Sequence, residues 1–132
     1  MDDLLFRGVA PALVTPFTAD DEIDEDAFRG LIQRQIDGGV SGLVVLGTTG
    51  ENPTITDEER RRLVDIAVET ADGRVPVIIG TGTNNTDQSV QYSVAAEKAG
   101  ADGVLVVGPY YNKPSQAGFV GHVEAIADAT DT

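Results

Sequence analysis

Four short apolar segments, repeated at the roughly thirty-residue interval of a βα unit, restrict the fold of this chain more than any other feature. They are VAPALV, LVVL, VPVII and VLVV, at residues 9–14, 43–46, 75–79 and 104–107. Three are continuous rather than alternating, as is typical of strands covered on both faces of a parallel sheet. A turn with glycine or proline and then a segment of helical period follow each one. The pattern predicts β-α repeated four times.

The predicted helices have recognisable ends. The first spans about 24–37, with apolar residues along one face. The second opens where Thr56 and Glu59 have the spacing of a capping box, and it stops at the Asp-Gly pair of residues 72–73. The expected N-caps of the third and fourth helices are Thr86 and Ser115.

An internal repeat favours a barrel over an open sheet. Residues 39–47 align without gaps with residues 100–108, so the second and fourth units look alike, which suits the alternate strands of a (βα)8 barrel. A flavodoxin-like sheet is the alternative, and it normally has a fifth strand. A full barrel needs about 250 residues. We therefore expect an α/β fold of four βα units, half of a TIM (βα)8 barrel, in one domain over residues 1–132 that ends before strand five.

The composition excludes several classes of protein. Twenty-two acidic and nine basic residues give a net charge of −13, which repels nucleic acid and anionic membranes. There is no cysteine, so disulfides and thiolate metal sites are excluded, and the N-terminal MDDLLFRG resembles neither a signal peptide nor a membrane span. We expect a soluble cytoplasmic protein. The acidic surface is typical of a halophilic protein, with an ordinary solvated surface as the alternative.

Two turns that follow predicted strands carry the chemistry. In GTTGE, at residues 47–51, glycines let the backbone approach a ligand, and amides and hydroxyls can hold a carboxylate without a lysine or arginine. A tight strand-to-helix connection is the structural alternative. Tyr110 and Tyr111 follow the fourth strand and should point in different directions. One phenol can line a site and pass protons, although both could instead be interface aromatics.

Three ordered motifs carry a family resemblance that covers essentially the whole chain. GTTGE, GTGTNNT and PYYNKPSQ begin at residues 47, 80 and 109, after a GVAPALVTPF segment at residues 8–17. The chain resembles the dihydrodipicolinate synthase and N-acetylneuraminate lyase family, and within it the dihydrodipicolinate synthase branch. The resemblance implies a (βα)8-barrel lyase that joins pyruvate to aspartate semialdehyde through a lysine Schiff base, in lysine biosynthesis. The N-acetylneuraminate lyase and 2-keto-3-deoxy sugar acid aldolase branches are alternatives.

The resemblance also implies roles for individual residues. Thr48 and Thr49 would bind the carboxylate of pyruvate or another small 2-oxo acid, and Thr48 would relay a proton. Tyr111 would reach across a tight dimer to complete that relay, with Tyr110 at the same interface. No metal and no cofactor is implied.

The resemblance does not extend to feedback inhibition by lysine. Asn84 matches a residue that lines the lysine-inhibition cavity of some family members. The surrounding positions Asp57, Arg60 and Gln88 depart from that pattern.

The Schiff-base lysine of the family belongs to later strands, and neither lysine of this chain is a good substitute. A Schiff-base amine must be unprotonated near neutral pH, which requires burial or a nearby cation. Lys98 lies beside Glu97 on a predicted helix and Lys113 on a predicted exposed loop, so both should be solvated. We expect the chain alone to be inactive.

The remaining polar candidates favour structural roles. Glu51 is expected to accept backbone amides rather than act as a base, and His122 to be a surface or packing residue. Residues 60–62, three arginines, should form a solvated helix face that pairs with the acids of residues 57–59 within the helix.

Two further hypotheses stay open. Half a barrel leaves strand edges and an interior face without cover, which predicts a homo-oligomer and allows a non-catalytic, self-associating protein. The GTTGE turn alone would also suit a phosphate-binding βα module.

Overall fold

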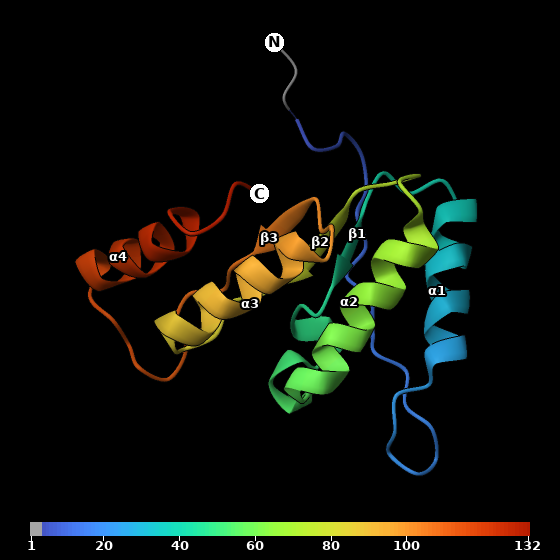
Figure 1. Cartoon of the computed structure of the whole chain (residues 1–132), viewed down its shortest axis with the longest axis horizontal. Coiled ribbons are helices and arrows are strands. Elements are labelled where there is room, and N and C mark those ends of the chain that lie inside the picture. Colours follow the sequence, from blue (N-terminus) through green and yellow to red (C-terminus); the bar gives the residue numbers. More distant parts are fainter. Residues whose placement is uncertain (1–3) are drawn as a thin grey trace.

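The computed structural model describes residues 4–132, so the first three residues of MDDLLFRG, and of the predicted domain, lie outside the described part. Its centre is a parallel sheet in the order β1-β2-β3 (Figure 1). The strands are β1, Leu43–Val45; β2, Val77–Gly80; and β3, Gly103–Leu105. They confirm the second, third and fourth strands predicted from the apolar segments.

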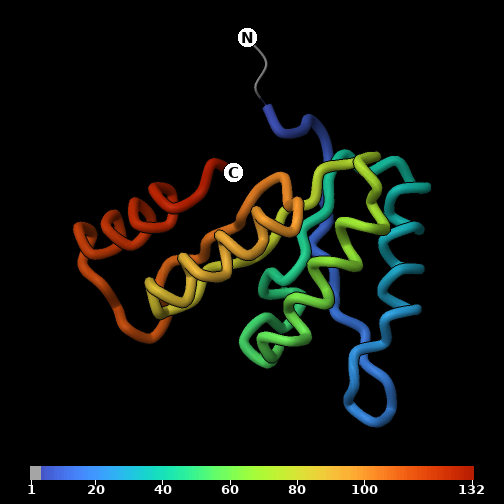
Figure 2. The backbone as a smooth tube through the Cα atoms, viewed as in Figure 1, coloured from blue at the N-terminus to red at the C-terminus, as the bar shows by residue number. Residues whose placement is uncertain are grey.

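The first predicted strand, residues 9–14, is shorter than expected. It lies parallel to β1 and forms a single bridge, Ala12 with Val44. Leu13 N donates to Val44 O over 2.9 Å, and Val44 N donates to Pro11 O over 3.0 Å. Pro11 has no N–H to extend the ladder, which suits the edge of a sheet. Figure 2 shows this segment beside β1.

Helices follow the strands in the order that the repeat predicts. Within residues 4–132 they are α1, Glu25–Asp37; α2, Asp57–Ala71; α3, Thr86–Lys98; and α4, Gln116–Ala127. Two 3-10 turns, η1 (Thr48–Gly50) and η2 (Asn52–Thr54), separate β1 from α2. The helices α1 and α2 pack together, as do α3 and α4 (Figure 1).

Side-chain caps fix where the helices begin. The capping box of α2 is present: Glu59 N donates to Thr56 Oγ1, and Thr56 N donates to Glu59 Oε2 over 2.8 Å. This backbone hydrogen bond from Thr56 lowers the pKa of Glu59. Ser115 caps α4 as predicted. The predicted N-cap Thr86 is wrong by one residue, because Asn85 Oδ1 accepts from Gln88 N and Thr86 is already helical.

The core lies between the sheet and its helices. Alternate residues of β1 and β2 are buried on the helix side: Leu43, Val45, Val77 and Ile79. They join a cluster whose helical members include Phe28, Ile32, Leu63, Ile66 and Ala96. Phe28 and Ile32, from the apolar face predicted for the first helix, are thus part of the core.

The opposite face of the sheet is open. Strand register places Val44, Ile78 and Leu105 on this face, with Ala12 opposite Val44 at the edge. Leu105 is 48% exposed, and Val14, two residues after Ala12, is 52% exposed. Strands whose sequences suggest burial on both faces are therefore covered on one, the arrangement expected of four βα units from a barrel. We call this row of apolar side chains the open face.

Arg62 forms an ion pair between two helices rather than within its own helix. Arg62 Nη2 lies 2.6 Å from Glu25 Oε2 of α1, and this hydrogen bond lowers the pKa of Glu25. The predicted pairing of residues 60–62 within α2 is wrong for Arg62 because its partner lies on the neighbouring helix. In the part of the chain described, no helix is long and apolar enough to cross a membrane.

Two glycines give a matched test of this packing. Gly30 is exposed on α1 with no atom within 4 Å of an added Cβ, whereas a Cβ on Gly80 would collide with the carbonyl oxygen of Leu46. We expect Gly30→Ala to raise the free energy of unfolding by about 0.5–1 kcal/mol through helix propensity. Gly80→Ala should lower it by about 1–3 kcal/mol or more, because β1 and β2 must separate. Urea denaturation measures both. Equal effects of the two substitutions would contradict this packing.

Candidate functional site at the carboxyl ends of the strands

The strand ends place the predicted site residues at one edge of the sheet. Because β1, β2 and β3 are parallel, the loops that follow them lie at the same edge. These loops span residues 46–56, 81–85 and 106–115, and they contain the three motifs of the sequence.

The GTTGE turn is a rigid 3-10 turn with an accessible outer side. Gly50 N donates to Gly47 O over 3.0 Å, and the buried Thr15 Oγ1 donates to Gly50 O over 2.7 Å. Gly47 is buried, whereas Thr48 and Thr49 are exposed. The turn is thus tied to Thr15, the residue directly after the first apolar segment, and Thr48 and Thr49 are exposed to solvent.

The expected role of Glu51 as an acceptor of backbone amides is wrong. Glu51 is exposed, and its carboxylate makes no hydrogen bond with any described residue. The nearby amides already have backbone acceptors: Glu51 N donates to Thr48 O, and Thr54 N donates to Glu51 O. Glu51 contributes a left-handed backbone, with φ of 59°, between η1 and η2.

A hollow of about 300 Å³ joins two of the predicted site residues. We call it the threonine hollow, and its lining is Leu46, Gly47, Thr48, Asn52, Pro53, Gly80, Leu105, Val107 and Tyr110. The structure therefore brings Thr48, after β1, and Tyr110, after β3, to the same cavity. Thr49 and Tyr111 are not part of its lining. The lining is mainly apolar and includes Thr48, Asn52 and Tyr110, a mixture that is typical of sites for small molecules.

The two tyrosines diverge, as predicted. Tyr111 is 90% exposed, and its φ of 65° lies in the left-handed region. Asn112 N donates to Tyr110 O over 2.7 Å, so the chain reverses tightly at Tyr111. Tyr110 lines the hollow while Tyr111 extends into solvent.

A buried hydroxyl network supports the loop after β2, and sequence reasoning missed it. Ser93 Oγ donates to Thr81 Oγ1 over 2.7 Å, and Thr83 Oγ1 lies 3.0 Å from Ser89 Oγ. All four residues are buried, and they fix the GTGTNN loop to α3. The signal that could have found it is the spacing: Ser89 and Ser93 are one helical turn apart, and Thr81 and Thr83 alternate along an extended chain.

Arg60 is buried, so its predicted place on a solvated helix face is wrong. Its side chain crosses from α2 to the end of β2, where Nη1 donates to Gly80 O over 2.9 Å. Its guanidinium carbon lies 4.1 Å from the centre of the Tyr92 ring, a stacked cation–π contact. Burial lowers the pKa of Arg60, and the neighbouring Tyr92 opposes that shift.

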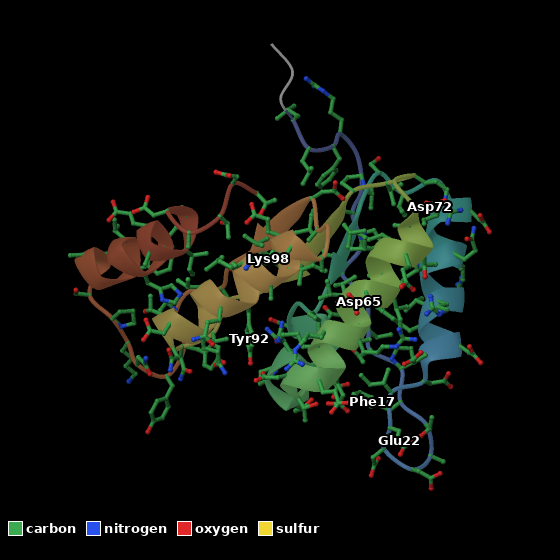
Figure 3. All side chains as sticks on the ribbon, in the orientation of Figure 1. Phe17, Glu22, Asp65, Asp72, Tyr92 and Lys98 are labelled. Carbon is green, nitrogen blue, oxygen red and sulfur yellow. The ribbon has the colours of Figure 1, made fainter. Side chains whose placement is uncertain are left out.

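Arg60 borders a second cavity of about 290 Å³. This arginine hollow is lined by Asn52, Pro53, Ile55, Asp57, Arg60, Thr83, Gln88, Tyr92 and Tyr110. Tyr92 OH donates to Asp57 Oδ1 over 2.5 Å, and Gln88 Nε2 donates to Tyr92 OH over 3.0 Å. Figure 3 labels Tyr92 on α3, from which it reaches Asp57 of α2. Tyr110 is a wall shared by both hollows.

The remaining candidates lie away from the threonine hollow. Lys98 and Lys113 are both exposed, as predicted. His122 is a packing residue: it is buried, and its Nδ1 lies 2.9 Å from Thr86 Oγ1, between α4 and α3. Among the described residues, no group of three His, Asp or Glu side chains could hold a metal ion.

Comparisons with known proteins match nearly the whole chain to one family. A family model described as the dihydrodipicolinate synthetase family matches residues 5–132. The curated 4-hydroxy-tetrahydrodipicolinate synthase of Salinibacter ruber is 77% identical over 129 residues, which are 98% of this chain and 43% of that relative.

Two solved structures show the same fold. The dihydrodipicolinate synthase of Thermotoga maritima has a TM-score of 0.93 and 48% identity, over 97% of this chain and 43% of the other. A prophage protein of the dihydrodipicolinic acid synthase family from E. coli K12, solved in complex with pyruvate, has a TM-score of 0.90 and 41% identity, over 93% and 41%. This chain therefore spans less than half the length of these relatives.

The cluster around Tyr92 predicts a pH dependence. Burial, and then the hydrogen bond to Asp57, raise the pKa of Tyr92, so the folded state favours the neutral phenol. This stabilisation is complete below the ordinary tyrosine pKa of about 10 and is lost as the pH rises through the higher value of the folded state. We expect the free energy of unfolding to fall in that alkaline range. Urea denaturation at several pH values measures the slope.

Three variants test whether Tyr92 causes the change in the free energy of unfolding with pH. Tyr92→Phe should remove its contribution, and Asp57→Asn should lower the pKa of Tyr92, which NMR of the ring detects. Tyr111→Phe removes a phenol outside the cluster and should leave the Tyr92 contribution in place. A slope that Tyr92→Phe does not change would refute this assignment.

Proposed function

The chain belongs to the dihydrodipicolinate synthetase family, and from this premise we propose that it forms the part of a 4-hydroxy-tetrahydrodipicolinate synthase site that holds pyruvate. The family resemblance carried by the motifs is confirmed. Our proposal adds that a 2-oxo acid binds in the threonine hollow, with Thr48 of its lining and Thr49, the next residue on the exposed turn outside the lining, as the carboxylate-binding residues.

The proposal rests on the observation that Thr48 and Tyr110 line the same cavity. The GTTGE turn offers hydroxyls and a glycine backbone at the mouth of an apolar cavity, and such donors hold a carboxylate by charge-assisted hydrogen bonds. No lysine or arginine lines the threonine hollow, so the turn itself must supply the donors. The E. coli prophage relative was solved with pyruvate, which supports a 2-oxo acid as the ligand.

Proton relay is the second part of the proposal. Thr48 would pass a proton between the bound acid and a tyrosine, because a hydroxyl both donates and accepts. Tyr111 is too exposed to serve the hollow of its own chain, so we assign it to the hollow of a second copy. Tyr110 would remain at the contact between the two copies.

Condensation requires an amine in a suitable place, and neither lysine of this chain offers one. Lys98 and Lys113 are exposed, whereas a Schiff-base lysine needs burial or a nearby cation. We therefore propose that the chain alone binds the 2-oxo acid without forming a Schiff base. The non-catalytic, self-associating half barrel is the second candidate, and the open face favours it.

The sugar acid aldolase, N-acetylneuraminate lyase and phosphate-binding hypotheses have less support. The names of the relatives favour the synthase over the two lyase branches. A phosphate-binding module rests on the GTTGE turn alone. Lysine inhibition also lacks support, because Asp57, Arg60 and Gln88 depart from the family pattern for it, and all three line the arginine hollow. The cytoplasmic location and the halophilic character stay predictions.

Binding of pyruvate tests the main proposal. In NMR titrations, pyruvate should shift the amide signals of Gly47 and Thr48, and inorganic phosphate should not. Thr48→Val keeps the shape but loses the hydroxyl, and should weaken binding about tenfold. Thr130→Val, far from the hollow, is the matched control and should bind normally. Equal binding by both variants would remove Thr48 from the site.

Borohydride reduction in the presence of pyruvate separates binding from chemistry. The intact mass of this chain should stay unchanged, because neither lysine is desolvated. An adduct on Lys113 would show that the loop after β3 can form the Schiff base, and would contradict the proposed inactivity.

The open face predicts self-association. Sedimentation in molar salt should show an oligomer, because Val14 and Leu105 expose apolar surface. Val14→Lys should weaken the association. Val120→Lys, on α4 with a similar exposure of 50%, is the control that distinguishes the open face from the helix. A compact, stable monomer of the unmodified chain would contradict this prediction.

A further inference from the structure

The turn formed by residues 110–112 has a strained backbone. Tyr111 is the centre of a three-residue turn in which Asn112 N donates to Tyr110 O, and its φ is 65°. Turns of this kind with positive φ are rare, because a side chain in the left-handed region crowds the backbone. Lys113 also has positive φ, at 49°. Tyr111 and Lys113 are not glycines, so contacts with surrounding residues must stabilise their left-handed backbone.

The side chain of Asn112 provides that support. Its Nδ2 donates to the backbone carbonyl of Asn84 over 2.7 Å, and its Oδ1 lies 3.4 Å from Asn84 Nδ2. The first bond is short and uses a main-chain acceptor, whereas the second is long. The loop after β3 is thereby held against the loop after β2.

The carbonyl that Asn112 uses belongs to a fixed loop. Thr83 Oγ1 donates to Asn85 O, and Asn85 N donates to Thr83 Oγ1 over 3.0 Å, so both neighbours of Asn84 are tied together. Thr83 N also donates to the buried Ser89 Oγ over 2.8 Å. The acceptor of Asn112 is anchored to α3 through buried hydroxyls.

We propose that Asn112 is a positioning residue, whose bond to the Asn84 carbonyl holds the strained turn so that Tyr110 lines the threonine hollow and Tyr111 points outward. This inference rests on the proposed function, in which the hollow binds a 2-oxo acid. Asn112 lines neither hollow, and it acts through the two tyrosines that flank its turn.

Two substitutions separate the strong bond from the weak one. Asn112→Asp keeps the shape but has no N–H to donate, and it places a carboxylate beside a carbonyl oxygen. Asn84→Ala is the matched control, because it removes only the 3.4 Å contact and leaves the carbonyl acceptor in place. We expect amide exchange at position 112 to become about tenfold faster in the first variant and to change less than threefold in the second.

The measurement needs an internal reference for folding. The amide of Ile79, in the central strand, should exchange at the same rate in both variants. If Asn112→Asp changes that rate as well, Asn112→Ala replaces it, with the same local acceleration expected. The proposal is overturned if amide exchange at position 112 is unchanged in the variant that leaves the Ile79 amide protected. It is also overturned if Asn84→Ala accelerates that exchange equally.

Pyruvate binding distinguishes positioning from simple loop stability. Asn112→Asp should shift the ring signals of Tyr110 and weaken pyruvate binding several-fold while the urea midpoint stays unchanged. If the unmodified chain does not bind pyruvate, the proposed function fails, and the exchange and ring signals still decide the role of Asn112. If pyruvate binds equally to both proteins while the ring signals move, Asn112 holds the turn without serving the site, and the proposal is wrong.

Discussion

The parallel pairing of β1, β2 and β3 is the constraint on which the rest of the structure depends. It forces every carboxyl end to the same edge, so residues about sixty positions apart, such as Thr48 and Tyr110, line one cavity. Pairing also brings the backbones of neighbouring strands so close at Gly80 that no side chain fits there. The carbonyl of that glycine then accepts the hydrogen bond of Arg60, which joins the sheet edge to α2.

Hydrogen bonds of polar side chains fix the loops at the strand ends in addition to apolar packing. The core of Leu, Ile, Val and Phe residues holds the helices against one face of the sheet, and at the strand ends it includes Leu46 and Ile55 of the loop after β1. Thr15 fixes the loop after β1, the Thr81–Ser93 pair fixes the loop after β2, and Asn112 joins the loops after β2 and β3. Because buried hydroxyls and amides have directional partners, these contacts set loop positions more narrowly than hydrophobic contacts do.

Local signals in the sequence predict most of the framework, and long-range contacts account for the errors. The capping box and the apolar periodicity are encoded within a few residues, so the start of α2 directly after its N-cap Thr56 and the burial of Phe28 follow from them directly. The prediction for Arg60 is wrong because its partners, Gly80 and Tyr92, lie 20 and more residues away, and only tertiary packing decides between burial and solvent. Tyr92 gives no signal of its own. The Thr48 turn and the tyrosine pair can be chosen as candidates from the sequence because glycine and aromatic residues stand out beside apolar strands. The role proposed for Asn112 depends on a turn geometry that no local pattern indicates.

The open face of the sheet has a thermodynamic consequence. Any molecule that covers Val14, Val44 and Leu105 in the folded chain, and does not bind the unfolded chain, stabilises the fold by mass action. The melting temperature of this chain then depends on how much of that molecule is present, including further copies of the chain itself. A measured melting temperature of this chain therefore reflects the protein concentration as well as the sequence.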